Sequence, residues 1–338
     1  MQKNIQVVLN RHPAGIPVPE DFALAEKAIP DLQEGQFLIR NRYFSMEPAI
    51  RGWLNGKPNY FEPIGLGEVI RAPSMGEVVA SRHPDYQPGE LVRGLNNWET
   101  YSVLSKDTIL LEKVHPSAGV PLSYYVGALG PSGHTAYVGL HQIGRIQAGD
   151  TVVISAAVGA VGSVAGQIAK RRGCRVIGLV GSDEKARIAT EQLGFDATIN
   201  YRKTENLSAA VQAVCPNGVD VYFDNVGGAT LDAMLLTMNV GGRIIGCGMI
   251  SGYNQQDNPP PVYNLWEIVS RQLEFKGFLL FSYADAIPAA VAQLEEWVRA
   301  GDFKVLEYKR IGIEQTAPLF CELMSGKTVG KAVLELSE

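Results

Sequence analysis

Glycines recur at short intervals between Ile154 and Lys170, where the sequence reads ISAAVGAVGSVAGQIAK. Gly159, Gly162 and Gly166 are accompanied by alanines, and no charged residue precedes Lys170. Small residues at a strand-to-helix turn let the backbone approach a pyrophosphate closely. The N-terminus of the helix that follows then offers N–H groups and a partial positive charge to the phosphates. The segment therefore predicts a dinucleotide-binding site.

The residues around this segment indicate a strand, a turn and a helix. TVVIS (residues 151–155) reads as a buried strand, and Val161, Val164 and Ile168 recur at helical spacing after the turn. Ala157 stands where a nucleotide-binding fingerprint carries its first glycine, and a methyl group is tolerated there if the turn does not require a positive φ. The competing interpretation is an alanine-glycine helix packed tightly on a sheet. The predicted cofactor-binding residues of this segment are Ala157, Gly159, Ala160, Val161 and Gly162.

The end of the next strand bears on the choice between NAD and NADP. A fingerprint for NAD places an acid there, about 20 residues after the glycines, to bond the ribose diol. Here the strand ends at Ser182, and Asp183 and Glu184 instead fit the first turn of a helix, where carboxylates suit the helix dipole. Lys185 follows one turn later. A small residue with a lysine behind it suits a 2′-phosphate, so the sequence favours NADPH.

Tyr201 and Arg202 follow the third strand, where they could close the same pocket. The alternative is that these residues and Lys185 are ordinary surface residues.

Composition limits the other classes of function. The chain has 338 residues, of which 46% are hydrophobic and 19% charged, so we expect two globular domains. A formal net charge of −5 argues against binding of nucleic acid. The start, MQKNIQVVLN, has no signal-peptide pattern, and no run of about 18 apolar residues predicts a membrane span. We therefore expect a cytoplasmic protein.

Cysteines and histidines do not follow the spacing of a metal site. The four cysteines contain no C-x-x-C pair, which indicates free thiols in a reducing compartment. Three of the histidines precede prolines, and His134 and His141 share a predicted helix without a nearby acid. The sequence therefore predicts no metal. The residues considered are Cys174, Cys215, Cys247, Cys321, His12, His83, His115, His134 and His141.

The elements around these residues fall into two groups. Runs such as FLIRNRYFS (37–45), GEVVASR (76–82) and ELVRG (90–94) indicate a β-rich, barrel-like unit. From near Pro121, helix and strand patterns alternate, beginning with a helix over residues 122–141. This alternation predicts an α/β fold with a doubly wound, parallel Rossmann sheet. Its strands are expected at 151–155, 174–180, 197–201, 219–225, 242–250 and 274–280.

The end of the chain returns to β-like alternation in KRIGIEQ and KAVLELSE. Both chain ends are therefore expected to build one domain, from residues 1–121 and 301–338, with the dinucleotide-binding domain at 122–300 between them.

A series of motifs along nearly the whole chain resembles one protein family. They are RHPAGIPVPEDF, SMEPAIRGWLNGKPNY, GALGPSGHTAYVGL, AAVGAVGSVAGQIAK, LGFDATINY, FDNVGG, GMISGYN and SGKTVGK. In this order they resemble the medium-chain dehydrogenase/reductase superfamily. The branch they resemble is its zinc-free branch of leukotriene dehydrogenase/prostaglandin reductases, plant alkenal double-bond reductases and bacterial curcumin reductases.

The resemblance implies a GroES-like β domain, a Rossmann domain and an active site in the cleft between them. In the family, NADPH gives a hydride to the β-carbon of an α,β-unsaturated ketone or aldehyde, and the chains form homodimers through the α/β domain. Carried over to this chain, it implies that Lys185 and Tyr201 hold the 2′-phosphate and Asn225 lies along the cofactor. Thr135 would lie beside the nicotinamide, and backbone from Phe278 to Leu280 would meet the carboxamide. Ser182 and Cys247 complete the implied cofactor-binding residues.

Three residues depart from the family pattern. Pro131 and His134 replace Met or Leu beside the nicotinamide, and Thr328 replaces an asparagine in the closing motif. These departures bear on the nicotinamide pocket and on one cofactor contact.

The resemblance places Tyr253 and Tyr60 at the substrate. A conjugated carbonyl gains negative charge on oxygen as hydride arrives, so a donor there lowers the barrier, and a tyrosine hydroxyl stays protonated at neutral pH. Tyr253 is the first candidate for this hydrogen-bond donor and Tyr60 the second. The enolate that hydride addition produces then takes its proton from Tyr253 or from water. Trp53 would line the same apolar cleft. Tyr263 and Trp266 also suit such a cleft, although interface or core packing is favoured for them.

Two other kinds of function stay open. One is a zinc-free quinone reductase or an alcohol dehydrogenase, and the other is a non-catalytic regulator that binds NADPH. Dinucleotide folds host all of these.

Overall fold

The computed structural model describes residues 3–255 and 258–337, and the chain divides into two compact units. The first unit comprises residues 1–127 and 307–338, and the second comprises residues 128–306. The sequence predicts these boundaries six residues earlier, after 121 and after 300. Residues 1, 2 and 338 of the predicted first domain lie outside the described residues. No helix in the described part of the chain is both long and apolar enough to cross a membrane.

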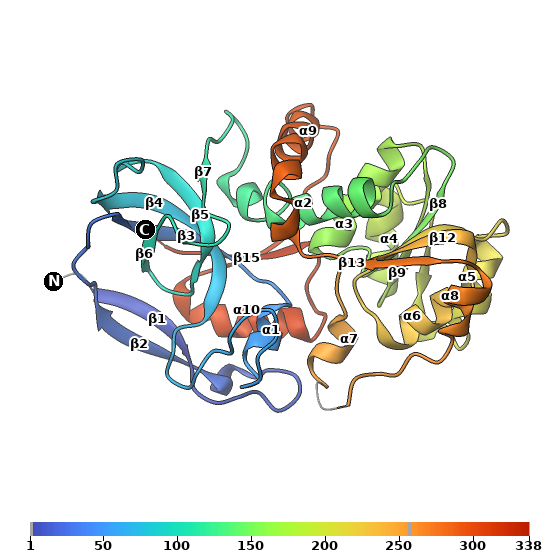
Figure 1. Ribbon diagram of the computed structural model, residues 1–338, viewed down its shortest axis with the longest axis horizontal. Coiled ribbons are helices and arrows are strands. Elements are labelled where there is room, and N and C mark those ends of the chain that lie inside the picture. The colour runs from blue at the N-terminus through green and yellow to red at the C-terminus, as the bar shows by residue number, and fades with distance from the viewer. Residues whose placement is uncertain (1–2, 256–257, 338) are drawn as a thin grey trace. The chain divides into compact units, whose positions relative to one another are not determined.

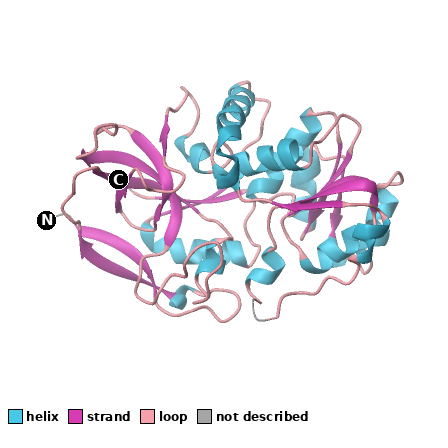
Figure 2. Ribbon diagram, in the orientation of Figure 1, coloured by secondary structure: helices cyan, strands magenta, loops and turns pink. Residues whose placement is uncertain are grey.

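The first unit is built mainly from β-strands of both chain ends (Figures 1 and 2). Its larger sheet has the order β14-β15-β3-β4-β5-β7, with β6 paired to β3, while β1 and β2 form a separate antiparallel pair. β15 runs antiparallel to β3, with Val333 opposite Ser45, so the two chain ends share one sheet. Its strands are β1 (Lys3–Leu9), β2 (Phe22–Ala28), β3 (Gln36–Ser45), β4 (Arg71–Ser81), β5 (Leu91–Asn97), β6 (Tyr101–Ser105), β7 (Glu112–Val114), β14 (Glu307–Ile311) and β15 (Lys331–Glu335). Its helices are α1 (Ile50–Trp53), α10 (Thr316–Met324) and the 3-10 turns Pro19–Asp21, Leu122–Val126 and Ile313–Gln315.

The second unit holds a six-stranded sheet in the order β10-β9-β8-β11-β12-β13, and every pairing in it is parallel. This confirms the predicted α/β class with a doubly wound Rossmann sheet. The strands are β8 (Thr151–Ser155), β9 (Arg175–Val180), β10 (Ala197–Asn200), β11 (Val219–Asp224), β12 (Met238–Gly246) and β13 (Glu274–Gly277). The α-helices are α2 (Pro131–Val138), α3 (Ala160–Arg171), α4 (Asp183–Arg187), α5 (Leu207–Val214), α6 (Gly228–Leu235), α7 (Ile250–Tyr253), α8 (Trp266–Ser270) and α9 (Ile287–Arg299). π-Helical turns span Gly139–Ile143 and Ile188–Gln192, and 3-10 helices span Tyr201–Lys203 and Leu280–Ala286.

Both faces of this sheet are covered, because alternate residues of a strand point to opposite faces. Tyr222 of β11 belongs to a buried cluster with Val211 of α5 and Leu231 of α6. Phe223 points to the other face, where a Cβ added at Gly139 would lie 2.7 Å from its ring. The apolar strands of the sequence are therefore buried on both sides, as a parallel sheet requires.

Three predicted elements are wrong in their limits. The helix expected over residues 122–141 is a 3-10 helix ending at Val126, and α2 starts afresh at Pro131. Gly127 has ψ −103°, outside the helical region, and Pro131 lacks an N–H and suits only the first turn of a helix. The strands expected to reach residues 250 and 280 end at Gly246 and Gly277.

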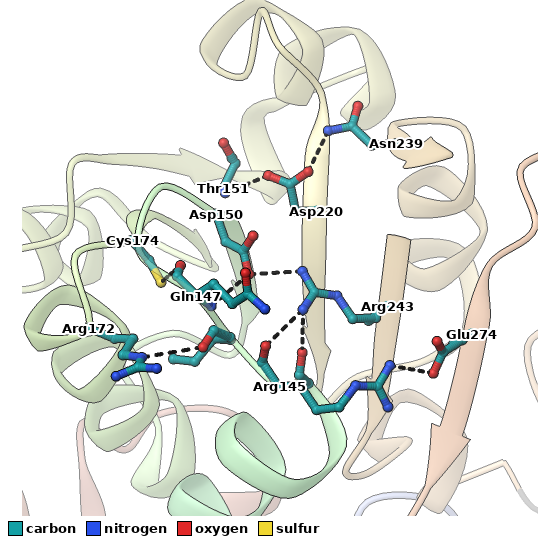
Figure 3. A network of polar contacts seen from close by, with 12 residues as sticks. Arg145, Gln147, Asp150, Thr151, Arg172, Cys174, Asp220, Asn239, Arg243 and Glu274 are labelled. Atoms are coloured by element: carbon teal, nitrogen blue, oxygen red, sulfur yellow. Dashed lines mark hydrogen bonds and ion pairs between the residues drawn. The ribbon is translucent and has the colours of Figure 1, made fainter. Parts of the chain in front are cut away.

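A polar network ties together the amino ends of the central strands (Figure 3). Arg243 of β12 donates at 2.9 Å to the carbonyl oxygens of Gly144 and Arg145 and pairs at 2.8 Å with the carboxylate of Asp150. The Arg243 and Asp150 side chains are each 16% exposed. Because this ion pair is largely removed from water, loss of either side chain would leave the charge of the other buried without its counter-ion.

We predict that Arg243→Ala lowers the free energy of unfolding by about 2–4 kcal/mol, since the Asp150 carboxylate loses its cationic partner and keeps only the Gln147 amide, while two carbonyl groups lose their donor. The change in the free energy of unfolding is measured by urea titration, with circular dichroism as the signal. The matched control is Glu274→Gln, which removes an exposed ion pair with Arg145 in the same network and should change stability by less than about 1 kcal/mol. Equal losses in the two variants would contradict the prediction.

Candidate active site

The turn after β8 explains how alanine replaces glycine at position 157. Ala156 has φ 49°, whereas Ala157 is not among the residues with positive φ. Ala157 is fully buried and donates its amide to the Leu179 carbonyl at 3.2 Å. A Cβ added at Gly178 of β9 would lie only 2.9 Å from the Ala157 methyl group. The methyl group therefore fits because the neighbouring strand has no side chain at that point.

α3 starts directly after this turn. Gly159 is its N-cap residue and gives no side-chain cap, so the first-turn amides, including those of Ala160 and Val161, lack the usual capping group. A Cβ added at Gly162 would lie 2.4 Å from the Ala156 carbonyl oxygen, which requires glycine there. An uncapped helix N-terminus beside a tight glycine turn fits the pyrophosphate of a dinucleotide.

Cationic groups gather where β9 and β10 end. Ser182 caps α4, and its Oγ accepts a hydrogen bond from the amide of Lys185 at 3.2 Å. A Cβ added at Gly181 would lie 2.9 Å from the hydroxyl of Tyr201 and 3.4 Å from Nε of Arg202. Burial, followed by the nearby Arg202 guanidinium, lowers the pKa of Lys185. Cationic side chains of this kind are suited to bind an anion.

The acid in this region is engaged elsewhere. Asp183 lies in the first turn of α4, as the sequence predicts, and its carboxylate accepts a hydrogen bond from Asn200 at 2.8 Å. It also forms an ion pair with Lys203. These contacts lower the pKa of Asp183, with the hydrogen bond from Lys203 as the largest cause. The carboxylate therefore has cationic and amide partners other than a ribose diol.

The residues that directly follow β11, β12 and β13 bond to neighbouring strand ends on the same edge of the sheet. Asn225 follows β11, and its amide donates to Oγ of Ser155 while its Nδ2 donates to the Ser155 carbonyl, both at 2.8 Å. The amide of Cys247, after β12, donates to the Asp224 carbonyl at 2.9 Å. The amide of Phe278, after β13, donates to the carbonyl of Gly246 at 3.4 Å.

Tyr253 is the last residue of α7, and its hydroxyl group lies next to the residues that follow β12. The hydroxyl oxygen accepts a hydrogen bond from the Met249 amide at 3.3 Å. A Cβ added at Gly248 would lie 3.2 Å from that oxygen, so glycine leaves space for the ring. The accepted bond holds the hydroxyl oxygen close to the residues that follow β12.

α2 is the helix that the resemblance places beside the nicotinamide, and it carries two of the residues that depart from the family pattern. Pro131 is the first residue of α2 and His134 is buried within it, whereas Thr135 is partly exposed. Leu280 starts the 3-10 helix that follows β13.

The aromatic residues of the first unit form a cluster of their own. The ring centroids of Trp53 and Tyr60 are 6.3 Å apart at 87°, and Phe61 packs edge-on against Trp53 at 5.3 Å. The Arg71 guanidinium lies 5.5 Å from the centroid of the Phe61 ring. Trp53 is buried, while Tyr60 is 46% exposed. Partial burial raises the pKa of Tyr60, so its hydroxyl is a donor at neutral pH.

Two sequence families match the chain. One, described as the N-terminal domain of oxidoreductase, matches residues 5–111, and another, described as zinc-binding dehydrogenase, matches residues 160–296. Over 341 residues the chain is 36% identical to the NADPH-dependent curcumin reductase of Escherichia coli, covering 99% of this chain and 98% of that protein. It is 37% identical over 338 residues to a 2-alkenal reductase (NADP(+)-dependent) of Nicotiana tabacum, with the same coverage.

The chain belongs to the medium-chain dehydrogenase/reductase superfamily. Within this superfamily it is an oxidoreductase of the curcumin reductase and 2-alkenal reductase branch, which confirms the resemblance seen in the sequence. The crystal structure of CurA in complex with NADPH from Vibrio vulnificus superposes with a TM-score of 0.91 at 36% identity, covering 99% of both chains.

The second unit of this oxidoreductase brings most of the predicted cofactor residues to the carboxyl ends of the parallel strands. They are Ala157, Gly159, Ala160, Val161, Gly162, Ser182, Lys185, Tyr201, Asn225, Cys247 and Phe278, together with Tyr253. Trp53, Tyr60 and Thr328 belong to the first unit, where Thr328 is buried between α10 and β15. Tyr263 and Trp266 are 79% and 70% exposed, so core packing, one of the two roles favoured for them, is wrong.

Asp224, which is fully buried at the end of β11, is not among the site residues that the sequence predicts. The sequence places it within an apolar strand, although an acid directly before Asn225 at a strand end is a usable signal. In residues 3–255 and 258–337, His, Cys, Asp and Glu side chains form no group of three or more that could hold a metal ion.

Proposed function

We propose that this protein is a cytoplasmic reductase that uses NADPH to reduce the carbon–carbon double bond of α,β-unsaturated ketones and aldehydes. The activities of two relatives support it, since one is an NADPH-dependent curcumin reductase and the other an NADP(+)-dependent 2-alkenal reductase. The observation that carries the cofactor assignment is the cationic group of Lys185 and Arg202 beside Tyr201, with Asp183 engaged by Lys203. The four cysteines, all among the described residues, form no disulfide, which suits the reducing cytoplasm.

The residues of the second unit fit the parts of NADPH in turn. The uncapped start of α3 would hold the pyrophosphate, and Lys185 with Tyr201 would hold the 2′-phosphate through charge-assisted bonds. Asn225 would lie along the cofactor, held by Ser155. When bound, NADPH supplies the hydride that is added to the β-carbon of the substrate.

The protein's own contribution to the chemistry would be positioning and a hydrogen-bond donor. Tyr253 would donate to the substrate carbonyl, or act through the ribose hydroxyl, because the Met249 amide already fixes its oxygen. Tyr60, on the first unit, is the second candidate donor. Proton delivery to the α-carbon then comes from Tyr253 or from water.

The test is NADPH consumption over a panel of aromatic, aliphatic and cyclic enones, quinones and alcohols, with the mass of each product measured. Our proposal predicts saturated ketones and aldehydes from the enones. A hydroquinone as the only product would favour a quinone reductase, and an oxidised alcohol with NADP+ would favour an alcohol dehydrogenase. Tight NADPH binding without turnover across the panel would favour a regulator.

We also propose a homodimer formed through the second unit. β13 is an edge strand whose four residues, Glu274–Gly277, are all exposed. Just before it, Trp266 and Val269 of α8 and the preceding Tyr263 expose large apolar side chains. An open strand edge beside apolar surface is typical of a protein–protein interface.

We predict that Trp266→Glu weakens the dimer by more than roughly a hundredfold, because it places a charge among the buried apolar residues of the interface. Light scattering coupled to size exclusion measures the mass of the species. Leu24→Glu is the control, since Leu24 is also exposed but lies on β2 of the first unit. A monomeric wild-type protein at tens of micromolar would contradict the proposed dimer.

A further inference from the structure

Asp224 has an unusual environment for a carboxyl group. It is the last residue of β11 and is fully buried, where an acid needs hydrogen bonds to be tolerated. Its Oδ1 accepts bonds from the Tyr222 hydroxyl at 2.7 Å, from the amides of Val226 and Gly227 at 2.9 Å, and from Oγ of Ser155 at 3.2 Å. Its Oδ2 has no partner among the described residues. A single carboxyl oxygen therefore anchors the whole group of donors.

Through these bonds and its main chain, Asp224 joins the ends of the three strands β8, β11 and β12. Ser155 ends β8, and besides donating to Asp224 it accepts the amide of Asn225 at 2.8 Å. The carbonyl of Asp224 accepts the amides of Cys247 at 2.9 Å and Gly248 at 3.1 Å, directly after β12. Asn225 and Cys247 are among the residues assigned to the cofactor above.

The turn after Asp224 contains two glycines and leads into a helix without a side-chain cap. Gly227 and Gly228 have φ 69° and 53°, in the left-handed region that only glycine adopts readily. Gly227 is the N-cap residue of α6 and supplies no side-chain cap. Further along, Oγ of Ser251 donates to the Val226 carbonyl at 2.6 Å. The carboxyl oxygen of Asp224 thus holds the amides of Val226 and Gly227, while the carbonyl oxygens of Asn225 and Val226 accept the amides of Ile250 and Ser251 at 3.3 and 3.1 Å.

We infer that Asp224 is a positioning residue for cofactor binding: without touching NADPH, it holds Asn225 and the ends of β8, β11 and β12 in the geometry that binds the dinucleotide. This inference rests on the proposed use of NADPH. Burial raises the pKa of Asp224 against the effect of its hydrogen bonds, so a neutral side chain of the same shape is a suitable replacement.

Asp220 provides a matched control on the same strand. It lies near the opposite end of β11, where its carboxylate accepts the Thr151 amide at 2.8 Å and Nδ2 of Asn239 at 2.7 Å (Figure 3). Loss of either aspartate removes hydrogen bonds from the sheet. Only loss of Asp224 disturbs the carboxyl ends, where the cofactor residues lie.

The experiment measures the Kd of NADPH by fluorescence titration, together with the Tm, for the wild type, Asp224→Ala, Asp224→Asn and Asp220→Ala. Asp224→Ala should raise the Kd roughly tenfold or more, and Asp220→Ala should leave it within about twofold although both lower the Tm. Asp224→Asn should restore binding to within about threefold of the wild type, because its amide oxygen accepts the same bonds.

Equal Kd values for Asp224→Ala and Asp220→Ala would overturn the inference, and so would a Kd for Asp224→Asn as weak as that of Asp224→Ala. If Asp224→Ala does not fold, Ser155→Ala takes its place, since it removes the acceptor of the Asn225 amide; an unchanged Kd in that variant would also overturn the inference. A wild-type protein that does not bind NADPH contradicts the proposed function itself, which separates the two failures.

Discussion

Replacing Lys185 by alanine is expected to raise the KM for NADPH roughly 10–100-fold, the usual loss for one charge-assisted bond to a phosphate. The KM for NADH should stay within about twofold, because NADH has no 2′-phosphate for the ammonium group to bind. Steady-state kinetics with each coenzyme at a saturating enone concentration measure the two constants. The ratio of the two KM values, rather than either one alone, reports the role of Lys185.

Arg187→Ala is the matched control for this variant. Arg187 lies on the same short helix, α4, but is exposed, so its loss should change neither constant by more than about twofold. Equal losses for NADPH and NADH in Lys185→Ala would contradict a phosphate contact and would point to damage of the helix instead.

The same site predicts a dependence on pH. Because burial and Arg202 lower the pKa of Lys185, the free enzyme loses this charge at a lower pH than an ordinary lysine would. The KM for NADPH is therefore expected to rise with pH in the alkaline range, while that for NADH does not. In Lys185→Ala this alkaline rise should disappear.

Tyr253→Phe is expected to lower kcat roughly 100–1,000-fold, as loss of one donor to a developing oxyanion does in other enzymes. The Kd of NADPH should stay within about threefold, because the ring and its packing are retained. Single-turnover measurement of NADPH oxidation with an enone separates the chemical step from binding.

Two other tyrosines make this result specific. Tyr263→Phe removes a hydroxyl from a residue that is 79% exposed, and it should leave kcat unchanged. Tyr60→Phe removes the hydroxyl of the second candidate donor, and its kcat is compared with that of Tyr253→Phe. A larger fall in kcat for Tyr60→Phe than for Tyr253→Phe would reverse the assignment of the donor, and unchanged turnover in both variants would remove tyrosine from the mechanism.

The parallel sheet and its phosphate-binding turn could be predicted because their signals are local. TVVIS and the glycines that follow it form strand, turn and helix as the pattern indicates, and Ser182 with Lys185 lies where the second strand ends. Ala157 was harder to interpret. Its methyl group is accepted because Gly178, on another strand, leaves the space, and such a pairing across strands is not visible from spacing along the chain.

The segment expected to form one helix from Leu122 to His141 shows where local signals were overlooked. Its apolar pattern is helical on both sides of a break, but Gly127 and Pro131 interrupt it. α10 is not predicted, because the expectation for this region rests only on the β-like alternation of KRIGIEQ and KAVLELSE on either side of it.

The least predictable part of the site is the role of Asp224. Its donors come from β8, from its own strand and from the following turn, and they converge only in the folded sheet. Within the strand VDVYFDN, the residue type indicates merely a polar strand end. The candidate donor tyrosines follow chiefly from the resemblance, since most tyrosines of a chain simply pack with their hydroxyl satisfied.

Transfer of deuterium from NADPH labelled at the nicotinamide C4 into an enone examines the proposed chemistry most directly. Each face of the nicotinamide is labelled in turn, and the position of the label in the product is determined by NMR. We predict that, with one of the two labelled coenzymes, deuterium appears on the β-carbon of a saturated ketone. Deuterium on the carbinol carbon of an unsaturated alcohol, or its absence from the product with both coenzymes, would contradict the proposed reaction.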